Sequence, residues 1–350
     1  MKSEINILLQ EGTVIPAHPL ALTKDLKLDE QRQRRLTQYY IASGAGGVAV
    51  GVHTTQFEIR NSDVNLLEPV LRLASEEIGK AALKRPFIKV AGIVGPTEQA
   101  ICEAKLAARY GYDLGLLSMG GLKDLPESEL VERARAIADI IPLFGFYLQP
   151  AVGGRLLSYD FWREFAEIPN VHAIKVAAFN RYQTLDVVRA VCQSSRRDKI
   201  ALYTGNDDNI AADLLTPYRF VVDGKQVEKK FVGGLLGHWA VWTNAAVNLL
   251  KEIKSAKTDQ RIQELLSEGI KVTDMNAAIF DSKNSFHGCI PGIHEILRRQ
   301  GLLDGTWCLN PNEKLSPGQL EEIDRVCLNY PEHVDDSFVR NFIHAHANGN

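Results

Sequence analysis

The chain has 350 residues, of which 45% are hydrophobic and 24% are charged, as in ordinary globular proteins. Its formal net charge of -3 gives no electrostatic reason to expect a nucleic acid or an anionic membrane as a partner. We find no apolar stretch of the roughly 18 residues that a membrane span needs, and we expect no signal peptide after Met1. The five cysteines are scattered without a Cys-x-x-Cys pair. This pattern argues against disulfides and a zinc site and favours the cytoplasm.

Short apolar runs recur about every 30 residues, which is the length of one βα unit. A run of this kind is typical of a buried strand in a parallel sheet. We predict eight strands, at residues 13–18, 47–53, 87–94, 112–119, 143–150, 171–178, 200–206 and 231–238.

Helix signals fill the intervals between these runs. Asp29 and Ser158 are placed to cap helices, and Pro96 and Pro126 are placed to open them. The corresponding helix ends are predicted near Gly44, Ala166, Gly111 and Pro142.

Eight strands alternating with helices predict an α/β fold, a (β/α)8 TIM barrel, for which about 250 residues are typical. A doubly wound open sheet is the alternative, but the Gly-x-Gly-x-x-Gly that would favour it is absent after the first strand. We expect the barrel to occupy residues 1–242 and a C-terminal helical extension to occupy residues 243–350, where amphipathic helical patterns predominate. The segment 344–350 is polar, and we expect it to be frayed.

Lys175 interrupts the apolar run 171–178. Burial disfavours the charged form of an ammonium and makes its neutral, nucleophilic amine available near pH 7. Lys175 shares a strand face with Ala173 and Ala177, which leave room around its stem if that face is turned inward. These features indicate catalysis through a Schiff base to a carbonyl substrate, whereas the alternative is a lysine that snorkels out of a strand end. Lys89 is a weaker candidate because it lies near a strand start, the end of a barrel that serves stability.

Tyr147 lies one strand upstream, near the end of a strand that Pro150 terminates. A phenol beside a Schiff-base amine can donate or accept the proton of a carbinolamine. We therefore predict that Tyr147 carries protons for Lys175, and the alternative is a tyrosine that only packs at the mouth of the barrel.

Residues with hydroxyl, imidazole or amide side chains, and glycines, lie at or near the ends of other predicted strands. Polar groups there could hold a substrate carboxylate, and glycines let a ligand approach the backbone closely. We predict as substrate-binding residues His53, Thr54, Thr55, Gly205, Asn206 and Gly233.

Asp207 and Asp208 follow the seventh predicted strand. They could bind a metal in a phosphate-binding barrel enzyme, whose activity a chelator would abolish. We favour a role in capping the next helix instead. His18, at the end of the first strand, resembles His53 in its placement and has weaker support.

Three segments are similar to one known family: residues 29–51, Tyr147 with Pro150, and residues 168–175. The last is the most specific, since it resembles the family's Schiff-base lysine segment. Over roughly residues 11–240 the chain resembles the dihydrodipicolinate synthase/N-acetylneuraminate lyase family of class I aldolases. The resemblance implies a (β/α)8 barrel with a C-terminal helical extension, usually tetrameric, in which Lys175 condenses with pyruvate or another 2-oxo acid and Tyr147 relays protons.

The chain departs from this family at the loop that reads Gly-Thr-Thr-Gly-Glu or Gly-Ser-Thr-Gly-Glu. Without a gap, the two hydroxyl positions of that loop fall on Val52 and His53, whereas a two-residue insertion brings the threonines 54–55 onto them. The synthases' arginine falls on Val152, and their aromatic pair is missing from residues 118–121. These differences argue against dihydrodipicolinate synthase itself.

We therefore predict a Schiff-base lyase, either an aldolase or a dehydratase, that acts on a 2-oxo acid such as pyruvate or a 2-keto-3-deoxy sugar acid. We expect no metal and no organic cofactor, because the iminium itself serves as the electron sink. The expected partners are a small-molecule substrate and further copies of the chain in a tetramer or dimer. The altered threonine loop motivates an alternative, a non-catalytic 2-oxo acid sensor of the same family.

Overall fold

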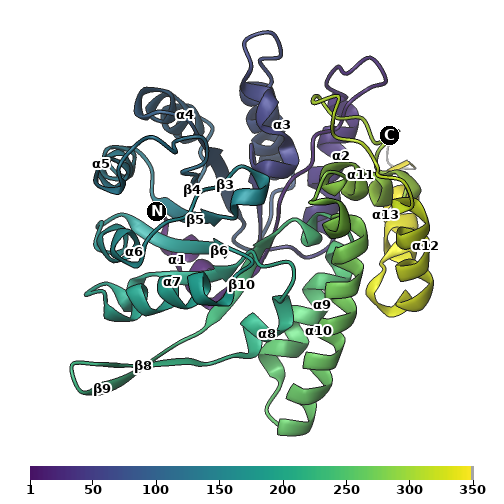
Figure 1. Cartoon of the computed structure of the whole chain (residues 1–350). Coiled ribbons are helices and arrows are strands. Elements are labelled where there is room, and N and C mark those ends of the chain that lie inside the picture. The colour runs from purple at the N-terminus through teal and green to yellow at the C-terminus, as the bar shows by residue number, and fades with distance from the viewer. Residues whose placement is uncertain (348–350) are drawn as a thin grey trace.

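The computed structural model describes residues 1–347, and in them eight parallel strands form a barrel surrounded by helices (Figure 1). The strand order is β1-β10-β7-β6-β5-β4-β3-β2, and a single bridge between Ala17 and Ala49 joins β1 to β2. Each of the eight predicted runs contains one strand. Their bounds are β1 Val14–Pro16, β2 Gly47–Val50, β3 Ile88–Ile93, β4 Leu114–Leu117, β5 Leu143–Leu148, β6 Val171–Ala177, β7 Ala201–Thr204 and β10 Phe231–Leu236.

Helices follow the strands and pack against the outside of the barrel. The Asp29 carboxylate accepts the backbone N–H of Arg32, and the Ser158 hydroxyl accepts that of Phe161, so both residues cap helices as their sequence signals indicate. The barrel helices are α2 Glu30–Ala42, α3 Leu67–Lys80, α4 Thr97–Arg109, α5 Glu127–Ala138, α6 Tyr159–Ala166, α7 Arg181–Gln193, α8 Ile210–Leu215 and α9 Thr243–Ser255. Short 3-10 turns are η1 His53–Thr55, η2 Phe57–Arg60, η3 Pro150–Val152, η4 Arg197–Lys199, η5 His238–Ala240, η6 Ser282–Asn284 and η7 Pro331–His333.

The strands separate two apolar cores because side chains alternate between the two faces of a strand. On β5, Phe144 and Phe146 belong to the core inside the barrel, whereas Leu143 and Tyr147 belong to the core between the strands and the helices. On β6, Ala173 and Ala177 line the inside. The same alternation turns Lys175 inward.

One helix and one hairpin have no counterpart among the predicted elements. The first is α1 Ser3–Glu11, which buries Ile5 and Leu9 in the inner core and so closes the barrel end where the strands begin. The second is a hairpin of β8 Tyr218–Val222 and β9 Lys225–Lys229, which projects from the barrel (Figure 1). Asp223 and Gly224 form its turn with positive φ angles, and an Asp-Gly pair is a strong hairpin signal.

Four further helices make up most of the C-terminal region: α10 Asp259–Ile279, α11 Cys289–Arg299, α12 Gln319–Asn329 and α13 Asp336–Ala347. The prediction of a frayed tail is wrong for residues 344–347, which continue α13, and residues 348–350 lie outside the described residues. Because α9 contacts β1 and takes the place of the eighth barrel helix, we propose a domain boundary after Ser255 rather than at residue 242. In the described part of the chain, no helix is both long enough and apolar enough to cross a membrane.

Candidate active site

A pocket opens at the end of the barrel where the strands finish, the end that carries catalytic residues in barrels of this kind. It contains about 600 Å³ of empty space, part of which is open to solvent. Its polar lining consists of His53, Thr54, Gln149, Lys175, Asp207 and Cys289. The apolar lining and the glycines are Ala17, Val52, Phe146, Leu148, Val152, Ala177, Phe179, Gly205, Gly237, Phe280, Phe286 and Ile293.

Lys175 extends from β6 into this pocket and is only 8% exposed. Its Nζ lies 4.4 Å from the centroid of the Phe146 ring, whose residue pairs with Lys175 across the strands. A methyl group at Gly205 would come within 2.5 Å of Lys175 Cε, so the glycine makes room for the stem of the lysine. The structure therefore brings Lys175 and Gly205 together in one site.

Lys175 and Asp207 each shift the pKa of the other through their charges. Burial lowers the pKa of the Lys175 ammonium, while the Asp207 charge raises it. Burial also raises the pKa of the Asp207 carboxyl group. The backbone N–H of His238 donates to Asp207 Oδ1 at 3.0 Å and acts in the opposite direction, lowering this pKa. An amine and a carboxyl group that both titrate closer to neutrality than usual are suited to proton exchange with a bound substrate.

Some residues of the loop after β2 line the pocket, and others stabilise the conformation of the loop. Thr54 lines the pocket, and its buried Oγ1 has no hydrogen-bond partner among the described residues. The Thr55 hydroxyl instead donates to His18 O at 2.7 Å and accepts the N–H of Gly51 at 3.0 Å, so Thr55 holds the loop in shape. His53 lines the pocket, and burial, aided by the Lys175 charge, lowers its pKa to about 4. Its imidazole is therefore neutral at pH 7.

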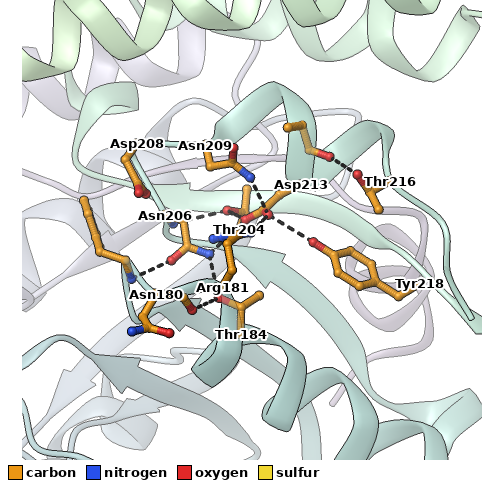
Figure 2. A network of polar contacts seen from close by, with 12 residues as sticks. Asn180, Arg181, Thr184, Thr204, Asn206, Asp208, Asn209, Asp213, Thr216 and Tyr218 are labelled. Atoms are coloured by element: carbon orange, nitrogen blue, oxygen red, sulfur yellow. Dashed lines mark hydrogen bonds and ion pairs between the residues drawn. The ribbon is translucent and has the colours of Figure 1, made fainter. Parts of the chain in front are cut away.

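Asn206 and Asp213 hold the loops after β6 and β7 in place (Figure 2). The Asn206 amide oxygen accepts the N–H of Phe179 at 2.9 Å, and its nitrogen donates to Asp213 at 2.9 Å. Asp213 is fully buried and also accepts hydrogen bonds from Arg181, Thr204, Asn209 and Tyr218. Asn206 does not line the pocket, so its placement supports a structural contribution rather than direct contact with a substrate.

Gly233 and His18 also lie away from the pocket. Gly233 is near the start of β10, where an added methyl group would meet the Thr13 backbone at 2.4 Å, and Gly237 lines the pocket instead. The His18 ring is buried and contacts Pro19 O and Thr37 Oγ1. Lys89 points to the helices, where its Nζ donates to Ser75 Oγ and to a backbone carbonyl.

The capping role favoured for the Asp207–Asp208 pair is wrong. Helix α8 begins with Asn209 as its N-cap residue and has no side-chain cap, while Asp207 turns into the pocket. Among the described residues, one group of three side chains has the spacing of metal ligands, and it consists of Glu268, Glu332 and His333. Lys271 bridges its two carboxylates, and the group includes neither Asp207 nor Asp208.

A family model described as the dihydrodipicolinate synthetase family matches residues 11–218. The chain belongs to this family. It is 30% identical over 206 residues to an N-acetylneuraminate lyase of Citrobacter koseri. The matched segment covers 58% of this chain and 65% of that protein. The chain is 29% identical to an N-acetylneuraminate lyase of Escherichia coli, over 54% of this chain and 60% of that protein. The chain thus matches less than two thirds of the length of these curated relatives.

Solved structures of family proteins share the fold. A dihydrodipicolinate synthase from Oceanobacillus iheyensis superposes with a TM-score of 0.73 at 17% identity and covers 93% of this chain and 99% of its own. An N-acetylneuraminate lyase from Fusobacterium nucleatum gives a TM-score of 0.70 at 18% identity, with coverages of 94% and 100%. The prediction of a TIM barrel with C-terminal helices is confirmed.

Tyr147 does not lie where the family resemblance implies. Its side chain is on the outer face of β5, against Trp162 of α6, with ring centroids 5.5 Å apart. Its hydroxyl accepts the Leu157 N–H at 3.3 Å and lies 3.4 Å from Leu157 O. Tyr147 is 1% exposed and does not line the pocket, so its predicted position beside the Lys175 amine is wrong.

The structure adds pocket residues that the sequence did not single out. Phe280, Phe286, Cys289 and Ile293 come from the C-terminal extension and reach the pocket from more than 100 positions beyond Lys175 in the chain. No local pattern signals such a contact. Gln149 was detectable from the sequence, since it lies just beyond a strand end, and His53, Thr54 and Asp207 also follow strand ends.

Proposed function

We propose that this family member is a class I lyase, an aldolase or a dehydratase, in which Lys175 forms a Schiff base with a 2-oxo acid such as pyruvate. The observation that carries the proposal is the buried Lys175 amine inside a pocket at the catalytic end of a barrel. Membership of the family supports it, because relatives named N-acetylneuraminate lyase and dihydrodipicolinate synthase are class I aldolases.

In this proposal the neutral amine of Lys175 attacks the keto carbon, and loss of water leaves an iminium. In an aldolase the iminium accepts the electron pair of the carbon–carbon bond that breaks. In a dehydratase it accepts the pair of a C–H bond on the third carbon, and the resulting enamine expels the hydroxyl group of the fourth carbon, whose bonding pair leaves with the oxygen as water forms. The lowered pKa of Lys175 supports this role, because it increases the fraction of neutral amine at pH 7.

We assign proton transfer to Asp207 in place of Tyr147. Asp207 lines the same pocket as Lys175, whereas Tyr147 faces α6. The raised pKa of the carboxyl group lets it hold or release a proton near neutral pH. Neutral His53 is placed to add a second hydrogen-bonding group.

The substrate carboxylate is assigned to Thr54. A buried hydroxyl without a partner costs free energy unless a ligand satisfies it, and the Thr54 Oγ1 is of this kind among the described residues. Gly205 contributes by making room for Lys175, and Asn206 by holding the Phe179 loop.

Reductive trapping tests the proposal directly. The full chain is incubated with pyruvate and borohydride, and the modified peptide is located by mass spectrometry. We expect the adduct on Lys175 and its absence from Lys175→Met. Lys89→Met is the matched control, because that lysine points to the helices and its loss should leave the adduct in place. No adduct at Lys175 with pyruvate or with several other 2-oxo acids would contradict the proposal.

A non-catalytic 2-oxo acid sensor is the second candidate. The outward orientation of Tyr147 favours it, since the proton carrier implied by the resemblance is removed from the pocket. A ligand that raises Tm without a trapped imine or product would support the sensor. A cytoplasmic location and a tetramer or dimer stay predictions.

A further inference from the structure

The pocket around Lys175 combines two chemically different sets of residues. Lys175, Asp207 and Thr54 supply polar groups and come from the barrel. The C-terminal extension supplies side chains that are apolar apart from the thiol of Cys289, including Phe286 and Ile293. The part of the pocket formed by the C-terminal extension is therefore suited to bind an apolar group of a substrate.

Phe286 and Phe179 contact each other edge to face where both line the pocket, with centroids 6.0 Å apart and planes at 77°. Their φ angles are 67° and 52°, a left-handed region that bulky residues rarely adopt. The Phe286 N–H donates to Asp281 O at 3.1 Å, and the Phe179 N–H donates to Asn206 Oδ1 at 2.9 Å. Hydrogen bonds of the backbone N–H groups thus hold both residues in strained backbone conformations at the pocket, an arrangement typical of functional sites.

We infer that this site takes a 4-hydroxy-2-oxo acid whose substituent beyond the cleaved bond is aromatic or branched aliphatic rather than a polyhydroxylated chain. The inference rests on the proposed Schiff-base function and adds the class of substituent to it. Aromatic rings and Ile293 offer dispersion and edge-to-face contacts to such a group. Hydroxyl groups placed against the same side chains would lose hydrogen bonds to water without replacement.

The chemistry balances without a further reactant. The Lys175 amine condenses with the keto carbon and releases one water. The bond between the third and fourth carbons breaks, its electron pair moves to the iminium to form an enamine, and the proton of the 4-hydroxyl group passes to a base as the aldehyde leaves. Protonation of the enamine and hydrolysis by one water release pyruvate and the free amine.

The test compares kcat/KM for pyruvate release by the full chain from 4-hydroxy-4-phenyl-2-oxobutanoate and from 2-keto-3-deoxygluconate. We expect a preference of at least about tenfold for the phenyl compound, within the range that apolar pockets provide. Equal values, a preference for the sugar acid, or cleavage of neither compound overturns the inference. Failure to trap pyruvate on Lys175 overturns the proposed function instead.

Variants test whether the pair of Phe179 and Phe286 causes the preference for the phenyl compound. We expect Phe286→Ala to lower the preference toward one and Phe286→Leu to keep more of it, because leucine retains an apolar contact. Tyr182→Ala is the matched control, since this aromatic residue of α7 is 82% exposed and should leave both kcat/KM values unchanged. An unchanged preference in folded Phe286→Ala counts against the inference, and if that variant does not fold the comparison on the unmodified chain decides.

Discussion

Asp207 is the residue that sets the electrostatic environment of Lys175. Its charge raises the pKa of the ammonium, which burial lowers. We expect Asp207→Asn to lower kcat by about 10²-fold or more, as loss of a proton-transfer group does. The acidic limb of the kcat/KM profile should move to lower pH, because activity rises as Lys175 loses its proton and the variant removes the charge that raises its pKa. The measurement is the pH dependence of kcat/KM and of imine trapping.

Asp208→Asn is the control for this change. Asp208 is the next residue in the chain and does not line the pocket, so its replacement should affect kcat far less. If the acidic limb of the kcat/KM profile of Asp207→Asn stays in place or moves to higher pH, the assigned interaction between Asp207 and Lys175 is contradicted.

At the scale of the elements, Asp213 of α8 joins the loops after β6 and β7 (Figure 2). Its fully buried carboxylate accepts hydrogen bonds from five side chains, and Asn206 extends the network to Phe179. Asp213→Ala leaves these donors without their acceptor, so we expect the free energy of unfolding to fall by about 3 kcal/mol or more. Chemical denaturation measures this change.

Asp186→Ala provides the comparison, since Asp186 forms an exposed ion pair with Arg189 at 3.0 Å. Exposed pairs contribute about 1 kcal/mol or less, so this variant should be nearly as stable as the unmodified chain. Equal losses in the two variants would show that the buried network does not stabilise the loops.

At the scale of the whole molecule, the barrel has one weakly paired seam. A single bridge joins Ala17 to Ala49, the His18 N–H donates to Ala49 O at 2.8 Å, and the Gly46 N–H donates to Val14 O at 3.0 Å. By contrast, β5 and β6 pair from Leu143 to Leu148. Local opening breaks fewer hydrogen bonds at this seam than between β5 and β6. We expect backbone amides of β1 and β2 to exchange with deuterium faster than those of β5 and β6. Mass spectrometry of the native chain measures the exchange, and equal protection of the two regions would contradict the expectation.

The sequence by itself determined the fold class and the strand face of Lys175. Regularly spaced apolar runs predict eight βα units, and the two alanines beside Lys175 identify the face that has room for its stem. These features could be predicted because they depend on local periodicity. The caps at Asp29 and Ser158 are local in the same sense.

The tertiary structure decided which side chains accompany Lys175. Both faces of β5 are apolar, because the strand is buried on both sides, so alternation alone could not say that Phe146 turns inward and Tyr147 outward. The role of Asp207 was ambiguous for a similar reason. A residue that caps the next helix and a residue that lines the pocket can both come directly after a strand, so its position in the sequence does not tell the two roles apart. Phe286 and the rest of the apolar covering depend on packing between distant parts of the chain, which local sequence patterns do not encode.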